Sequence, residues 1–223
     1  MLRNHLIKGA GGKPVEVIDS YIDFNAGDTA STAMDPTGGS SPLLLLTLSR
    51  RFSLGTPSAT VTSTADSYTS IDTYSSGAFS AYGGSMINVL ELANVADSSS
   101  ITASISNSGG SFVVTNTLAA VLLDNPTASA AINDVTINTS SNSTITETID
   151  VVKNGILIIL AEDNATQAVT ESGSSLLGAV TQTASDGGRV LYYATVENTG
   201  TATIESIITG GSFEGLMLIS IAP

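Results

Sequence analysis

The chain has 223 residues, with 42% hydrophobic and only 12% charged residues, which is enough apolar content for a folded protein and argues against general disorder. Seven basic against 20 acidic residues give a net charge of −13, so the body lacks the clustered cations that nucleic-acid binding requires. The sequence contains no cysteine, which excludes disulfide bonds and thiolate metal sites.

The N-terminal segment MLRNHLIKGAGGKPVEV concentrates positive charge in an otherwise acidic chain. Three basic residues lie within its first 13 positions, and no acidic residue precedes Glu16. Three apolar residues lie among them, and a flexible terminus cannot bury such residues by itself. We therefore expect this arm to dock on a partner subunit that offers an acidic groove. The expected docking residues are Leu2, Arg3, Leu6, Ile7, Lys8 and Lys13.

The same segment does not match a secretory signal peptide. Such a signal needs an apolar stretch of about 7–15 residues after its basic start, whereas Lys8 and three nearby glycines interrupt the arm. The longest apolar runs, at 43–46 and 156–161, are far shorter than the roughly 20 residues of a membrane span. We therefore expect synthesis in the cytoplasm, without a signal peptide and without membrane insertion.

Most of the chain has the pattern of short β-strands. Residues 15–24, VEVIDSYIDF, predict one strand with Val15, Val17, Tyr21 or Ile22, and Phe24 facing inward, and the Gly-, Thr- and Ser-rich residues up to 41 predict a loop or linker. From residue 42 onward, β-branched and apolar segments alternate with turn signals. The predicted strands are 43–48, 59–63, 86–92, 101–105, 112–123, 135–138, 144–152, 156–162, 190–196, 202–208 and 216–221.

Two kinds of strand can be distinguished by their faces. Residues 144–149 and 201–207 alternate between polar and apolar side chains, which indicates one wet face, whereas 43–46 and 156–160 are apolar on both faces and predict central strands. This number of short strands predicts an all-β fold, an antiparallel β-sandwich with jelly-roll-like topology. The predicted division is an N-terminal attachment arm and linker at 1–41 and one sandwich domain at 42–223. No repeat with a period of about 20–50 residues is visible.

Four segments carry a resemblance to a known group of proteins: SSPLLLLTLSRR, SMINVLELANVADSSSITASIS, VVKNGILIILAEDN and GGRVLYYATVENTGTATIESIITGGSFEGLMLISIAP. They resemble β-sandwich virion proteins of marine tailed phages, gene transfer agents and related prophages. In such proteins a run of aliphatic residues opens the sandwich, and a closing pair of strands carries aromatic residues, a Gly turn and alternating Thr. This chain differs in having no tryptophan, which many of them carry.

The resemblance covers residues 42–223 and implies a structural component of a virion, made in the host cytoplasm and released by lysis. Its place would be a head decoration or spike, a neck or tail fibre, or a receptor-binding knob. Its partners would be other virion proteins. The low charge of the chain suits a surface that neighbours cover, and favours homo-oligomers or repeated copies on a symmetric shell.

Residues suited to catalysis are sparse. His5 is the only histidine, and it lies in the arm without an orienting acid, so no Ser-His-Asp triad is expected. Paired carboxylates could serve a glycosidase, but some of 20 acids lie close by chance, and the aromatic platforms of sugar-cleaving clefts are scarce at 5% aromatic residues. We therefore expect no enzyme; a depolymerase would need two carboxylates facing each other in a deep cleft.

The sequence also predicts no metal site and no cofactor. One histidine and no cysteine leave too few ligands for zinc. Calcium stays open because it needs only oxygen ligands, which Glu162-Asp163-Asn164, Asp186 and Asp124-Asn125 offer. These are also ordinary turn residues, and none follows the spacing of a calcium loop.

The segment ADSYTSIDTYSSGAFSAYGG predicts a long loop in which Tyr68, Tyr74, Phe79 and Tyr82 lie among Ser and Gly. Rigid aromatic residues among adaptable hydroxyl groups are typical of binding loops, so this loop is a candidate receptor site. The alternative function is accordingly a carbohydrate-binding or adhesin module that recognises a host-surface glycan. The other interpretation is that these rings pack onto the sandwich. Thr-x-Thr pairs elsewhere also raise an ice-binding hypothesis, which needs aligned threonines on one flat face.

Overall fold

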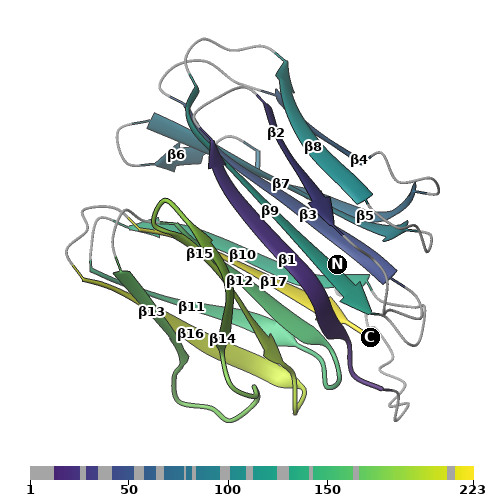
Figure 1. Ribbon diagram of the computed structural model, residues 1–223. Helices are drawn as coiled ribbons and strands as arrows, with labels where there is room; N and C mark the ends of the chain where they lie inside the picture. Colours follow the sequence, from purple (N-terminus) through teal and green to yellow (C-terminus); the bar gives the residue numbers. More distant parts are fainter. Residues whose placement is uncertain are drawn as a thin grey trace, which may run out of the picture.

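The fold is known from a computed structural model, drawn in Figure 1, that describes residues 13–25, 29–34, 42–52, 58–63, 68–77, 79–81, 84–95, 101–108, 113–124, 131–140, 143–162, 166–209 and 214–223. These residues form seventeen β-strands, and helices are absent from them. Every strand pairing is antiparallel. The predicted all-β antiparallel sandwich is therefore confirmed.

The first half of the chain forms two sheets. Sheet A has the strand order β1-β9-β3-β7-β5, with β6 pairing to β7, and sheet B has the order β2-β8-β4. The strands are β1 (Glu16–Asn25), β2 (Thr29–Met34), β3 (Pro42–Phe52), β4 (Ser58–Ser63), β5 (Tyr68–Ser75), β6 (Phe79–Ala81), β7 (Gly84–Val95), β8 (Ile101–Ser108) and β9 (Val113–Asp124).

The second half forms two further sheets. Sheet C has the order β10-β17-β12-β15-β14, and sheet D has the order β11-β16-β13. The strands are β10 (Ala131–Ser140), β11 (Thr144–Val151), β12 (Ile156–Glu162), β13 (Thr166–Glu171), β14 (Thr181–Asp186), β15 (Arg189–Thr195), β16 (Gly200–Thr209) and β17 (Glu214–Ala222).

The two halves share one topology. If the short β6 is set aside, the first, eighth, third, sixth and fifth strands of each half lie side by side in the larger sheet, and the second, seventh and fourth in the smaller one. The first strand of each half has a register shift at its third residue, between Val17 and Asp19 in β1 and between Ile132 and Asp134 in β10. In both, the aspartate carboxylate accepts a hydrogen bond from the next backbone N–H.

The pairing register of the strands makes the two halves equivalent residue by residue, and similarities in sequence support this alignment. In β7 and β15 the pairings align Asn88 with Arg189, and the aligned segments, NVLELANV and RVLYYATV, share four residues. The tetrapeptide GGSF follows each segment at the same distance, at 109–112 and 210–213. Strand order, register and sequence together indicate that the chain contains two copies of one sandwich.

The four sheets stack as layers in the order B, A, C, D, from the upper right to the lower left of Figure 1. The larger sheets of the two halves face each other across an apolar core, drawn from sheet A (Leu45, Leu90, Leu92, Val121) and sheet C (Ile156, Ile158, Leu160, Ile219). A second core lies between sheets C and D. Because sheet C is covered on both faces, all seven residues of β12 are buried, as predicted for a central strand.

The two halves are related by an approximate two-fold axis. The first strand of each half contacts the fifth strand of the other, since β1 packs against β14 and β10 against β5. This exchange of equivalent partners is what an isologous interface between identical subunits produces. Each leucine or isoleucine buried there contributes about 1.5–3 kcal/mol, so the interface is a major part of the stability of the chain.

The structure differs from the sequence predictions in two places and decides between two alternatives in a third. Residues 29–34, TASTAM, were expected in a loop but form β2, which pairs with β8. The segment around Tyr68, expected as one long loop, holds the edge strands β5 and β6. The sequence left either Tyr21 or Ile22 as the inward residue of β1; the bulge in this strand shifts its alternation, so that Ile22 enters the core.

Candidate functional site

A polar layer closes one end of the core between sheets A and C. In sheet C a row of register partners runs from Thr139 through Gly215 and Glu162 to Arg189 and Asp186. Glu162 and Arg189 are each only 8% exposed, and they extend the face of β12 and β15 that packs against sheet A. The equivalent row in sheet A is Phe24, Thr117, Ser49, Asn88 and Ser76.

The two rows meet at Arg189 and Phe24. The guanidinium carbon of Arg189 lies 3.5 Å from the centroid of the Phe24 ring, which is a cation–π contact removed from water. Arg189 Nη1 also donates a hydrogen bond of 2.7 Å to the carbonyl oxygen of Gly187. The backbone N–H of Phe24 donates one of 2.8 Å to Asp186 Oδ2. β1 of the first half is therefore joined to the β14–β15 hairpin of the second.

Gly187 allows this close approach. Its φ of +53° is strained for a residue with a side chain, and a Cβ there would lie 2.8 Å from Phe24 Cδ1. Further along the same pair of edges, the hydroxyl groups of Ser20 and Thr183 are hydrogen-bonded at 2.5 Å. The edge strands of the two halves are thus matched over several residues.

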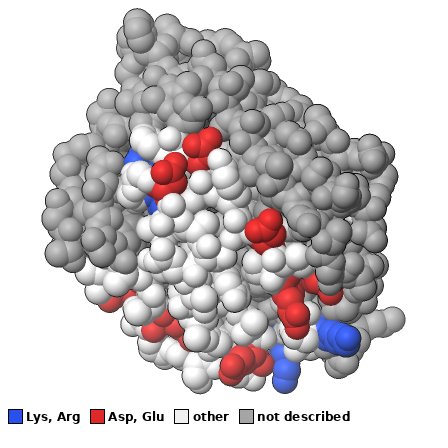
Figure 2. All heavy atoms as spheres, viewed as in Figure 1, with Lys and Arg blue, Asp and Glu red and all other residues white. Residues whose placement is uncertain are grey.

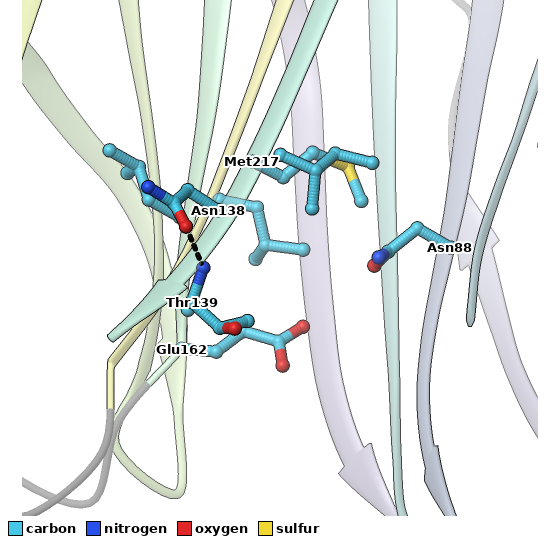
Figure 3. A pocket seen from close by; sticks show the side chains of 9 residues that line it. Asn88, Asn138, Thr139, Glu162 and Met217 are labelled. Atoms are coloured by element: carbon cyan, nitrogen blue, oxygen red, sulfur yellow. Dashed lines mark hydrogen bonds between the residues drawn. The ribbon is translucent and has the colours of Figure 1, made fainter. Parts of the chain in front are cut away.

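The opposite side of the approximate two-fold axis is built differently. There the register places Asn88 where the other side has Arg189, and Thr139 where it has Phe24. A small cavity lies at this position, lined by Asn88, Ile137, Asn138, Thr139, Leu160, Glu162, Gly215, Leu216 and Met217. Figure 3 shows the amide of Asn88 and the carboxylate of Glu162 pointing toward one another from the two sheets.

The backbone around the cavity is firmly held. The N–H of Asn88 donates to Ser76 Oγ and its carbonyl oxygen accepts from the N–H of Ser76, both at 3.0 Å. Asn138 Oδ1 accepts a hydrogen bond of 2.7 Å from the N–H of Thr139, and its Nδ2 donates to Glu147 Oε1. The Nδ2 of Asn88 is buried and has no acceptor among the described residues.

Two carboxylates, those of Asp23 in β1 and Asp186 in β14, lie near each other at the edge where the two halves meet, and not in a deep cleft. Burial raises the pKa of Asp23 above its ordinary value, and the negative charge of Asp186 raises it further. Burial, followed by the charges of Asp23 and Asp186, also raises the pKa of Tyr21. Asp186 accepts the N–H of Phe24, so it has a structural part in joining the two halves.

A second surface feature is an exposed row of threonines on sheet D. Thr144, Thr146 and Thr148 of β11 are exposed, whereas Ile145 and Ile149 on the other face are buried, and Thr148 pairs with Thr203 of β16. This is the predicted pattern of one wet face. Charged residues interrupt the row, because Glu205 pairs with Thr146 and Asp150 accepts a hydrogen bond from Thr201. Figure 2 shows acidic groups scattered over a mainly uncharged surface in the described part of the chain.

Most of the arm residues predicted for docking lie outside the described residues. These are Leu2, Arg3, Leu6, Ile7 and Lys8, together with His5. Lys13 is described and exposed, three residues before the start of β1. The docking site stays a prediction.

The four aromatic residues of the predicted receptor loop are placed unequally. Tyr74 packs against the core between the halves, so its ring contributes to the sandwich. Tyr68 lies in β5 and Phe79 in β6, and Tyr82 is outside the described residues. Of the oxygen-rich turns, Glu162 belongs to the polar layer and Asp186 to the β14–β15 hairpin. No three acidic or histidine residues converge as metal ligands within the described segments.

Sequence reasoning missed Asn88 and Arg189, and considered Glu162 only as a candidate calcium ligand. The signal that identifies them is the internal repeat, because aligning NVLELANV with RVLYYATV places a neutral amide opposite a guanidinium at one buried position. A search limited to short periods does not find a repeat of about half the chain.

The described residues contain no helix with the length and hydrophobicity needed to cross a membrane. The class that fold and site define is a protein of two fused, jelly-roll-like β-sandwiches. No known protein family, curated protein or solved structure matches the chain.

Proposed function

We propose that this chain is a non-enzymatic structural protein of a virion, of the kind carried by tailed phages or gene transfer agents. The observation that supports a structural role best is the fusion of two sandwiches through one shared apolar core. That core buries the facing surfaces of the two larger sheets, and these surfaces therefore hold the two halves together. Hydroxyl-rich outer strands and scattered acids suit a body that is displayed or packed in many copies.

The N-terminal arm is the proposed means of attachment. Its cations, Arg3, Lys8 and Lys13, have the opposite charge to the rest of the chain, and its apolar residues are suited to a groove on a neighbour. We place the partner among other virion proteins and not on nucleic acid, because the cations outside the arm are few. A head decoration, a neck component and a tail fibre fit this attachment equally well.

Particle incorporation tests the proposal. Purified particles should contain the full-length chain at a fixed copy number, measured by quantitative mass spectrometry. Deleting residues 1–13 should abolish incorporation while leaving the far-ultraviolet circular dichroism spectrum of the soluble protein unchanged. The double variant R3E/K8E should behave like the deletion, and K153E, which reverses an exposed lysine on the body, should incorporate normally. Absence of the chain from all particles would refute the virion role, and normal incorporation of the deletion would refute docking by the arm.

A carbohydrate-binding or adhesin module is the second candidate. The observation that favours it is the exposed edge of sheet A, where Ser70, Thr73 and Ser75 of β5 are exposed and Ile71 is 38% exposed. Hydroxyl groups beside an apolar side chain can bind a sugar on a host surface. A glycan array probed with the assembled full-length protein tests this function, and the complete lack of binding would eliminate it.

A further inference from the structure

Asn88 is a buried amide at the interface of the two halves. Its residue is 1% exposed, and Nδ2 has no acceptor among the described residues. Buried polar groups are nearly always hydrogen-bonded, either to protein or to an ordered water molecule. Since its backbone is fixed to Ser76 on both sides, Asn88 cannot turn its amide to solvent without disturbing the edge of sheet A.

The cavity beside Asn88 has a structural origin in the internal repeat. On the other side of the approximate two-fold axis, the long side chain of Arg189 covers the ring of Phe24. Here the shorter Asn88 and Thr139 take the equivalent positions, and Gly215 lies between Thr139 and Glu162 in the row without a side chain to fill the space. The cavity is the volume that the smaller residues leave.

The size of this cavity, and two polar side chains among the residues that line it, fit one small hydrogen-bonding molecule. It has room for the centre of about one water molecule, which is the minimum for hydration, and a site must also offer polar partners. Asn88 supplies a donor, and the Glu162 carboxylate, which points toward it in Figure 3, supplies acceptor lone pairs. The rest of the lining includes Leu160 and Met217.

We propose that one ordered water molecule binds in this cavity and bridges the two halves of the chain. The water accepts a hydrogen bond from Asn88 Nδ2 and donates one to the carboxylate of Glu162. A cation fits less well, because the amide presents a donor and because Glu162 has the cationic Arg189 as its register partner. This water bridge links the two halves at the position equivalent to that of the Arg189–Phe24 contact, which lies across the approximate two-fold axis.

A crystal structure of the full-length protein at about 1.5 Å resolution tests the site. We expect one water oxygen between about 2.7 and 3.2 Å from Asn88 Nδ2 and hydrogen-bonded to Glu162. A protein acceptor on Nδ2 with no density in the cavity would overturn the proposal. So would a peak surrounded by six or more oxygen atoms at about 2.4 Å, which identifies calcium.

Water-oxygen magnetic relaxation dispersion tests the same site in solution, because it counts long-lived internal waters. Asn88→Leu removes the donor with little change in volume, and we expect it to lose one such water. Asn198→Leu, at an exposed turn, is the matched control and should lose none. The double variant N88R/T139F rebuilds the pair found on the other side, and should also lose one water. An unchanged count in both cavity variants would refute the bridge, even if either variant were less stable.

Discussion

Replacing Phe24 with leucine tests how strongly the Arg189–Phe24 contact joins the two halves. The guanidinium carbon lies 3.5 Å from the ring centroid and Arg189 is 8% exposed, so the contact is largely shielded from water. A desolvated cation–π contact contributes about 2 kcal/mol. Leucine keeps part of the apolar volume but has no π face. We therefore expect Phe24→Leu to lower the free energy of unfolding by about 1–3 kcal/mol in urea titrations of the full-length chain.

A double-mutant cycle isolates this contact from the general cost of each substitution. Arg189→Met alone should cost about 3–5 kcal/mol, because its register partner Glu162 keeps a buried carboxylate that loses a nearby cation. The coupling between Phe24→Leu and Arg189→Met should be about 1–2 kcal/mol. Tyr74→Leu is the matched control, since Tyr74 packs on the same core from the opposite edge of sheet A. Zero coupling at Phe24, or equal coupling at Tyr74, would refute the reasoning.

Three further substitutions test other parts of the structure by the same urea titrations. Leu45→Ala, at a fully buried position in the core shared by the halves, should cost about 2–5 kcal/mol and leave one cooperative transition; separate transitions of the halves would contradict a shared core. Gly187→Ala should destabilise more than Gly173→Ala, because both glycines have positive φ but only Gly187 abuts Phe24; equal losses would show that the contact is loose. The raised pKa of Asp23 means that the folded state holds its proton more tightly than the unfolded chain does, so this carboxylate reduces stability once the pH exceeds its ordinary pKa. Asp23→Asn should therefore be more stable than the natural protein at pH 7, and this gain should vanish as the pH falls below the ordinary pKa; a gain that persists at low pH would assign the effect to another cause.

The sequence predicts the architecture well where patterns are local. Alternation along 144–149 correctly indicates one wet face, because β11 covers sheet C with its isoleucines and exposes its threonines. The apolar run at 156–160 correctly indicates a central strand, because β12 is packed between two sheets. These predictions succeed because the side-chain period of a strand directly reports which of its faces is buried.

The sequence fails to predict features that depend on partners distant in the chain. Apart from its two threonines, the segment TASTAM has residues with little strand preference of their own, and it becomes β2 because it pairs with β8 about 70 residues away. The inward direction of Ile22 depends on a bulge opposite β9. Asn88 has no local signal at all, since its importance comes from the cavity that two halves form together.

The presence of two sandwich copies in one chain explains how the interface between them can differ on the two sides of the approximate two-fold axis. In a dimer of identical subunits a two-fold axis makes every contact occur twice, so a substitution changes both copies together. Once two copies lie in one chain, equivalent positions can change independently. Phe24 and Arg189 fill the polar layer on one side of the axis with a cation–π contact, while their equivalents, Thr139 and Asn88, line a small cavity on the other side. Because equivalent residues around the axis need not be alike, the side with the cavity can hold a water molecule, while the Arg189–Phe24 contact on the other side keeps the halves together.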